Sequence, residues 1–220
     1  MTYWRQKSFQ YFLLQDMESI FDLEIQQNST DAKIVAGLER ISQVFKVLLW
    51  EKAAQFGLSP IQIQLLIFIR YHSKEKATVS YLAKEFNVTK ATISETVKVL
   101  EKKNYIVKNS NTRDSRSYAI GLTDEGLKIV SSTENFTYPL TDSISTISQK
   151  EKIILWKNIS SLLYELHLSQ VIKVESSCYS CRFYTEKNNE KHCSLMDLKL
   201  ETQNIRLDCK EHNPLLLQAF

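Results

Sequence analysis

The segment between Thr78 and Leu122 constrains the fold of this 220-residue chain more than any other. Thr78 precedes a short run of helical character, and Thr89 precedes a second helical run over about 90–102. Threonine is a common helix cap, and Asn87 suits the turn between the two runs. The spacing therefore predicts two short helices joined by a tight turn.

A two-stranded hairpin is predicted directly after the second helix. Asn104 tolerates the left-handed conformation that ends a helix, and residues 105–107 read as a strand. A polar loop over 110–117 leads to a return strand in which alternate residues are apolar: Tyr118, Ile120 and Leu122. Helix, turn, helix and hairpin is the element order of a winged helix-turn-helix.

Helices are predicted on both sides of this segment. Apolar residues recur at helical spacing over about 3–26 and 32–55, and Asp31 is the expected cap of the second of these helices. Ser148 and Glu151 form a capping box that opens a further helix. With only 4 Gly and 3 Pro, the chain has too few turn residues for an all-β fold. The expected fold class is mainly α with a small β-hairpin wing.

The positive charge is concentrated on the winged segment. Residues 74–116 hold ten basic and five acidic residues, a net charge of +5, which leaves −2 for the rest of the +3 chain. Binding to DNA phosphates needs such a local surplus, because it is driven by the release of counterions. The small whole-chain charge excludes only non-specific coating of nucleic acid.

Residues 79–126 resemble the winged-helix core of the MarR transcriptional regulators. The similarity rests on five short matches. They are Leu82-Ala83 in the first motif helix, V-T-K-A-T-I-S at 88–94, L-E-K-K-N at 100–104, D-S-R at 114–116 and L-T-D-E-G at 122–126. Asn104 stands where the family has glycine.

The resemblance implies a homodimeric transcriptional regulator, in the first instance a repressor, and not an enzyme. Two recognition helices would read the half-sites of a pseudo-palindromic operator in double-stranded DNA. The implied DNA-binding residues are Thr89, Lys90, Thr92, Ser94 and Lys98 on the recognition helix and Arg113, Asp114 and Arg116 in the wing. Asp114 is expected to orient Arg116, and Glu95 departs from the basic residue of many family members. The signal could be a small-molecule effector in the cleft between the dimer helices and the winged domain, or a change at the cysteines.

The chain divides accordingly into four regions. Residues 1–30 form an extra N-terminal helix, and residues 57–123 form the winged helix-turn-helix DNA-binding domain. The helical dimerisation region combines 31–56 with 124–171, and a Cys-rich module occupies 172–220.

All four cysteines fall within this last region, with the spacing Cys178-x2-Cys181-x11-Cys193-x15-Cys209. A C-x2-C turn brings two thiolates to one metal ion, and two later thiolates complete a tetrahedron. The spacing predicts a zinc site, with an iron–sulfur cluster as the alternative. His192 and His212 lie near the cysteines, and whether either is a ligand stays open.

The remaining features favour a cytoplasmic protein. No apolar run approaches the roughly 18–20 residues of a membrane span, and the N-terminus lacks the apolar core of a signal peptide. Cysteines in a reducing compartment serve metals or redox chemistry more often than disulfides. The alternative function is a redox protein that uses an iron–sulfur cluster, although no Gly-rich cofactor loop is present.

Overall fold

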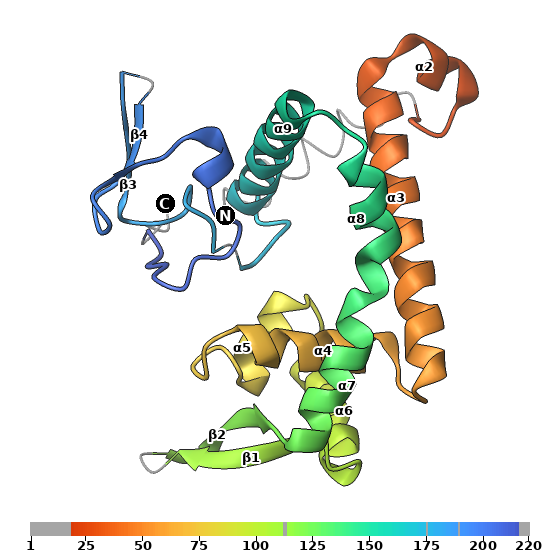
Figure 1. The fold of residues 1–220 in the computed structure, drawn as a ribbon, viewed down its shortest axis with the longest axis vertical. Coiled ribbons are helices and arrows are strands. Elements are labelled where there is room, and N and C mark those ends of the chain that lie inside the picture. Colours follow the sequence, from red (N-terminus) through yellow and green to blue (C-terminus); the bar gives the residue numbers. More distant parts are fainter. Residues whose placement is uncertain (1–18, 112–113, 175, 189, 216–220) are drawn as a thin grey trace, which may run out of the picture. The chain divides into compact units, whose positions relative to one another are not determined.

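The computed structural model describes residues 19–111, 114–174, 176–188 and 190–215. It is mainly helical, with a small antiparallel hairpin, as the sequence predicts (Figure 1). The chain forms two compact units, residues 1–51 and 52–220, which are taken separately below. Among the described residues, no helix combines the length and the apolar character that crossing a bilayer requires.

The first helix of the described chain is α2 (Leu23–Asn28). Its cap is Asp22, whose carboxylate accepts a hydrogen bond from the backbone N–H of Glu24 at 2.8 Å. A continuous helix over 3–26 is therefore wrong at its C-terminal end, because the backbone turns at residues 20–22 and a new helix starts. The remainder of that prediction, residues 3–18, lies outside the described residues.

Helix α3 (Thr30–Gln55) begins two residues before the predicted start. The side chain that caps it is Ser29, whose hydroxyl accepts a hydrogen bond from the N–H of Ala32 at 3.2 Å. Asp31 is not the cap but lies in the first turn, where its negative charge interacts favourably with the positive end of the helix dipole.

The winged helix occupies the start of the second unit. Its elements are α4 (Pro60–Tyr71), α5 (Val79–Glu85), α6 (Lys90–Lys102), β1 (Ile106–Asn111), β2 (Asp114–Leu122) and α7 (Asp124–Thr133). Every one of these elements contributes to one core. Its largest fully buried side chains are Ile63, Leu65, Leu66, Leu82, Ile93, Val97, Leu100, Ile106, Ile120, Val130 and Thr133.

The two caps predicted for this domain, Thr78 and Thr89, are confirmed, and Thr123 caps α7 in the same way. The hydroxyls of Thr78, Thr89 and Thr123 each accept a hydrogen bond from a backbone N–H in the first turn of the helix that follows. Asn87 and Asn104 adopt positive φ angles of 51° and 58°, so each provides the left-handed residue that its turn requires. Local side-chain chemistry therefore defines where these helices begin and end.

The hairpin is longer than the sequence indicates. β1 and β2 pair antiparallel, with Ile106 opposite Leu122 and Ser110 opposite Tyr118. The predicted loop over 110–117 is wrong in extent, because ladder pairing continues through polar residues to Asn111 and Asp114. Hydrophobic alternation alone could not reveal strand residues that lie beyond the core.

A close backbone contact explains why the L-T-D-E-G motif ends in glycine, at Gly126. A Cβ atom at this position would stand 2.0 Å from the carbonyl oxygen of Tyr105. Only glycine therefore allows the first turn of α7 to approach the start of the hairpin this closely. The N–H of Thr123 also donates to the same Tyr105 carbonyl, at 3.1 Å.

The helical stretch after the winged domain is interrupted just before Pro139, which lies in the first turn of α8 (Tyr138–Ser145). A 3-10 turn, η2 (Glu134–Thr137), separates α7 from α8. The longest helix of the second unit, α9 (Gln149–Leu168), opens with the predicted capping box of Ser148 and Glu151.

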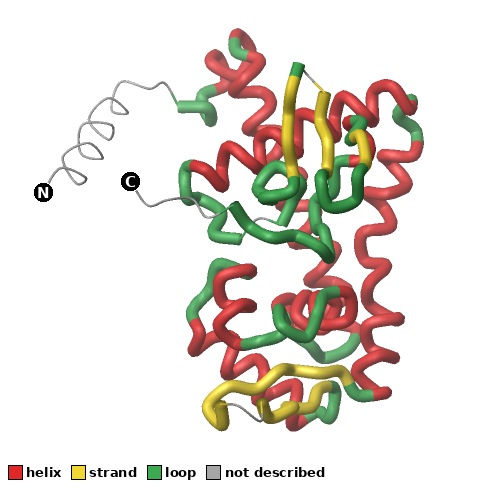
Figure 2. The backbone as a smooth tube through the Cα atoms, turned by 90° about the vertical axis from the view of Figure 1, so that its left-hand side faces the viewer, coloured by secondary structure: helices red, strands yellow, loops and turns green. Residues whose placement is uncertain are grey.

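The Cys-rich module forms a small sheet that the sequence did not reveal. Strands β3 (Tyr184–Lys187), β4 (Glu190–Cys193) and β5 (Leu198–Lys199) pair antiparallel in that order, followed by η3 (Thr202–Asn204). Figure 2 shows these strands and the wing hairpin as separate strand regions.

Candidate nucleic-acid interface and cysteine cluster

Helix α6 has one buried and one exposed face. Ile93, Thr96, Val97 and Leu100 are buried and face the core. The residues expected to meet DNA lie on the opposite face: Thr89, Lys90, Thr92 and Lys98 are exposed, and Ser94 is half-buried. The helix therefore presents a polar face with hydroxyl and ammonium donors at its N-terminal end.

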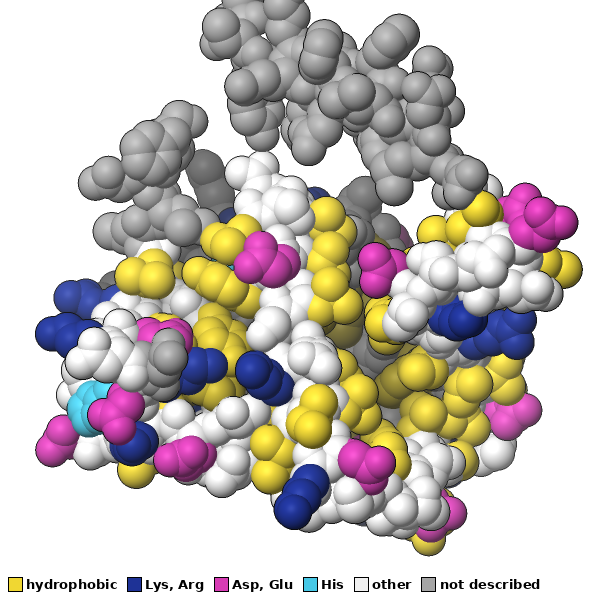
Figure 3. Space-filling model, turned by 90° about the horizontal axis from the view of Figure 1, so that it is seen from above, with side chains coloured by type: hydrophobic (Ala, Val, Ile, Leu, Met, Phe, Trp, Pro, Cys, Tyr) yellow, Lys and Arg dark blue, Asp and Glu magenta, His cyan; other side chains and the backbone are white. Residues whose placement is uncertain are grey.

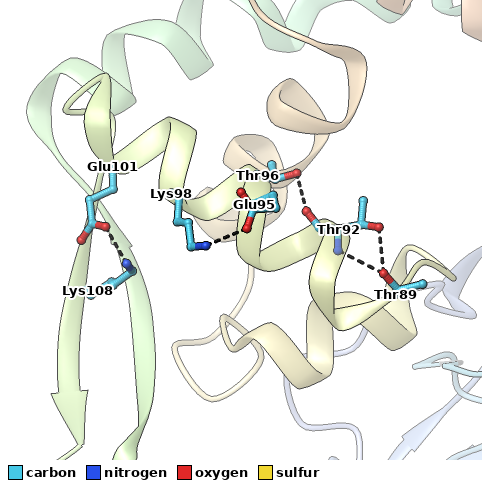
Figure 4. A network of polar contacts seen from close by, with 7 residues as sticks. All are labelled: Thr89, Thr92, Glu95, Thr96, Lys98, Glu101 and Lys108. Carbon is cyan, nitrogen blue, oxygen red and sulfur yellow. Dashed lines mark hydrogen bonds and ion pairs between the residues drawn. The ribbon is translucent and has the colours of Figure 1, made fainter.

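The first turn of α6 is fixed by paired threonines (Figure 4). Thr89 Oγ1 accepts a hydrogen bond from the N–H of Thr92 at 3.0 Å, and the two hydroxyls lie 2.9 Å apart. The hydroxyl of Thr96 donates to the carbonyl of Thr92 at 2.9 Å. Both hydroxyls expected at the DNA surface thus also hold the helix terminus in shape.

Glu95 lies one turn beyond Thr92 on α6 and forms an ion pair with a lysine that is expected to contact DNA. Lys98 Nζ donates to Glu95 Oε1 at 2.6 Å, and both side chains are more than 60% exposed. Sequence reasoning identified Glu95 as a departure from the family but missed this ion pair. The i, i+3 spacing on a helix is the signal that could have revealed it.

A second ion pair joins the recognition helix to the wing. Lys108 Nζ of β1 donates to Glu101 Oε2 of α6 at 2.5 Å. The Glu101 carboxylate is the main reason that the pKa of Lys108 is raised above its usual value. The same ammonium group lies 5.3 Å from the ring centroid of Tyr118 on β2. These contacts link the base of the wing to the helix beside it.

The tip of the wing holds the three remaining residues that are expected to bind DNA. Arg113 lies outside the described residues, and the side chains of Asp114 and Arg116 do as well, although both residues belong to strand β2. The predicted orienting contact between Asp114 and Arg116 therefore stays a prediction.

The four cysteines of the module are all buried, and none forms a disulfide. A tight turn joins the first two, since the N–H of Cys181 donates to the carbonyl of Cys178 at 3.1 Å. The backbone N–H of Arg206 lies 3.3 Å from Cys178 Sγ, and the guanidinium of Arg206 lies 3.6 Å from Cys209 Sγ. Two sulfur atoms thus accept hydrogen bonds from one residue.

The surroundings of the Cys178 thiol favour its neutral form. Burial raises the pKa of the Cys178 thiol, and the nearby Cys209 and Cys193 raise it further. A metal ion would offset both effects, because it stabilises the thiolate form. Within the described residues, no group of three or more His, Cys, Asp or Glu side chains is arranged to hold a metal ion. The donor chemistry fits a metal, but the side chains do not enclose an ion-binding position.

The two histidines near the cysteines have other neighbours. His192 Nε2 lies 3.3 Å from a carboxylate oxygen of Asp197, and His212 Nε2 lies 2.8 Å from the hydroxyl of Ser180. These contacts favour thiols over imidazoles as the donor set.

The module has a small core that includes side chains of α9. Cys178, Cys193, Leu200 and Ile205 form its buried cluster, and Trp156 of α9 packs against them. Further along the same helix, the Tyr164 ring lies 5.6 Å from that of Tyr179. Sequence reasoning missed this dependence, because it treated α9 and the module as separate regions.

Comparison with known proteins agrees with the geometry of the winged domain. Residues 56–117 match the family model described as the MarR family. The chain is 30% identical to the HTH-type transcriptional repressor MdtR of Bacillus subtilis (strain 168) over 93 residues, 42% of this chain. That alignment spans 59% of the repressor, less than two thirds of its length.

Solved structures of S. aureus MepR are similar over 60% of this chain. The MepR–DNA complex matches with 27% identity and a TM-score of 0.53, covering 97% of the MepR chain. MepR in its DNA-binding conformation matches with 25% identity and a TM-score of 0.54, covering 98%. The relatives are transcriptional regulators and not enzymes, as the sequence led us to expect. Residues 56–117 of this chain are therefore similar to the MarR family model, and the chain has the winged-helix fold of the MepR structures.

Proposed function

We propose that this chain is a homodimeric, sequence-specific DNA-binding regulator of transcription that acts as a cytoplasmic repressor. The observation that carries the proposal is the exposed face of α6, where hydroxyl and ammonium groups occupy the first turns of a capped helix on the most basic segment of the chain. Two similar proteins support it: MdtR is an HTH-type transcriptional repressor, and MepR has been solved as a complex with DNA.

Each residue of this face has an expected role. Lys90 and Ser94 are placed to reach base edges or phosphates from the N-terminal half of α6. Lys98 lies one turn further along α6 and suits a phosphate. The phosphate contact would replace its ion pair with Glu95. Arg113 and Arg116 would extend the contact from the wing into the minor groove.

Apolar residues that are exposed in the single chain support the homodimer. They lie on the helices expected to pair: Ile34, Val35, Leu38, Ile41, Val44, Phe45, Val47 and Trp50 on α3, and Ile154, Leu155, Ile159 and Leu162 on α9. Figure 3 likewise shows hydrophobic side chains open at the surface. Apolar surface on this scale is typical of a protein–protein contact, and the proposed partner is a second copy of the chain.

The direct test is a mobility-shift series against genomic fragments at physiological salt. We expect one fragment to compete at least about a thousandfold better than bulk DNA. Lys90→Ala should weaken binding to that fragment, whereas Lys157→Ala on α9 should not. If no fragment outcompetes bulk DNA, the proposed function is wrong.

We further propose that the four cysteines bind a metal, with zinc as the first candidate and an iron–sulfur cluster as the alternative. The site would be structural or would sense metal or redox state. Support comes from the burial of all four thiols and from the N–H groups of Arg206 directed at two of them. Metal analysis and an absorption spectrum after anaerobic purification test it. One zinc per chain without visible absorbance indicates a zinc site, visible absorbance with iron indicates a cluster, and metal-free folded protein refutes the proposal.

A further inference from the structure

A pocket of about 340 Å³ opens between the winged domain, the end of α9 and the Cys-rich module. Its walls include Lys76 and Tyr81 from the α4–α5 region, Tyr164 from α9 and Ser176 from the module. The Nζ atom of Lys76 donates to the Ser176 hydroxyl at 3.1 Å, so a hydrogen bond joins two of these walls. The volume is within the range of small-molecule sites.

The charged side chains of the pocket share one sign. Lys76, Lys84 and Lys173 all line it, and no Asp or Glu among the described residues does. Within the same part of the chain, neither Lys84 nor Lys173 forms an ion pair. Two acids lie outside the pocket lining: Glu85 interacts electrostatically with Lys76, and Asp208 lines a neighbouring hollow that Lys76 also lines.

The rest of the wall is aromatic and aliphatic. The ring of Tyr81 lies 5.7 Å from the Lys76 ammonium group, and Tyr164 contributes a second ring. Leu168 and Val174 add aliphatic surface. An occupant would therefore meet both ammonium groups and apolar side chains.

We propose that this pocket binds a small organic anion. Three ammonium groups without a lining carboxylate favour a negatively charged group, since charge-assisted hydrogen bonds to Lys are among the stronger polar contacts. The two tyrosine rings and the aliphatic side chains favour a compact apolar body. Lys173 and Ser176 lie outside the matched residues 56–117, so the site depends on the part of the chain that extends beyond the matched domain.

The binding test uses the full chain without DNA and phenyl phosphate as the probe. Calorimetry should show one site per chain, and phenol, which lacks the charged group, should bind at least about tenfold more weakly. The double variant Lys84→Gln/Lys173→Gln should lose about tenfold in affinity for phenyl phosphate. The matched variant Lys157→Gln/Lys187→Gln removes two exposed lysines that do not line the pocket and should bind as the parent does. Equal binding of phenol and phenyl phosphate overturns the proposal, as does full binding by the Lys84/Lys173 variant.

A second measurement needs no substitution and so cannot fail through misfolding. Phenyl phosphate should protect Lys84 and Lys173 of the unmodified protein from acetylation by an amine-reactive ester, read by mass spectrometry. Lys157 and Lys187 should be modified at the same rate with and without the probe. Protection of all four lysines, or of none, overturns the proposal.

Discussion

The winged helix and the Cys-rich module of the same chain are stabilised in different ways. The winged helix has a core to which α4, α5, α6, α7 and both hairpin strands contribute fully buried side chains. The buried cluster of the module has four residues, two of them cysteines, and takes Trp156 from α9. The first region is therefore stabilised by its own apolar residues, whereas the second depends on a neighbouring helix and, by our proposal, on a metal.

Removal of the proposed metal should have the largest effect, and only on the module. Dialysis against a strong chelator should expose residues 176–209 to proteolysis and to rapid amide exchange, because metal binding supplies folding free energy to small sites of this kind. The winged helix should keep its exchange protection in the same experiment. A module that stays protected without metal would show that its small core suffices.

Loss of a core side chain should instead destabilise the winged helix. Leu100→Ala removes a fully buried side chain of α6 and should lower the free energy of unfolding of the winged helix by about 3 kcal/mol. Val99→Ala, at a neighbouring position that is 40% exposed, should cost less than about 0.5 kcal/mol. Urea unfolding followed by circular dichroism measures both. Similar losses for the two variants would mean that this core is less well packed than its burial indicates.

The caps of the winged helix should each contribute less than a core residue. Thr89→Ala removes the acceptor for the Thr92 N–H and should cost about 1 kcal/mol of unfolding free energy. Thr89→Ser keeps a hydroxyl at the same position and should recover most of that loss. If serine does not restore stability, the hydroxyl is not what stabilises the helix terminus.

The smallest effect is expected at the surface of α6. Glu95→Gln releases Lys98 from its ion pair, so affinity for non-specific DNA should rise about threefold and the salt dependence should steepen by about one counterion. Glu125→Gln breaks an ion pair of the same spacing and length on α7, with Lys128, and should leave both quantities unchanged. Fluorescence anisotropy over a salt series distinguishes the two variants, and identical behaviour would count against α6 as the DNA-binding surface.

The same contrast explains what the sequence could predict. The winged helix follows from local signals, because Thr78, Thr89 and Asn104 act on their own turns and Ile93 and Val97 follow the helical period. The family resemblance led us to expect Thr89, Lys90, Thr92 and Lys98 at the surface, and all four are exposed.

The features that were missed depend on contacts between distant residues or on polar pairing. The strands of the module have no apolar alternation, and Trp156 meets Cys178 and Cys193 only in the folded chain. The extended hairpin ends in polar residues that no hydrophobic pattern distinguishes from a loop. The sequence placed all four cysteines in one module, but it did not indicate how their sulfur atoms are arranged.

The packing of Trp156 also limits where this chain can be shortened. A protein cut after Leu168 would keep every residue of the matched winged helix and the whole of α9. It would leave Trp156 and Tyr164 without the side chains that now cover them. The shortened protein would expose a new apolar surface on α9. Any self-association of that protein would then result from the truncation and would not reflect the natural assembly.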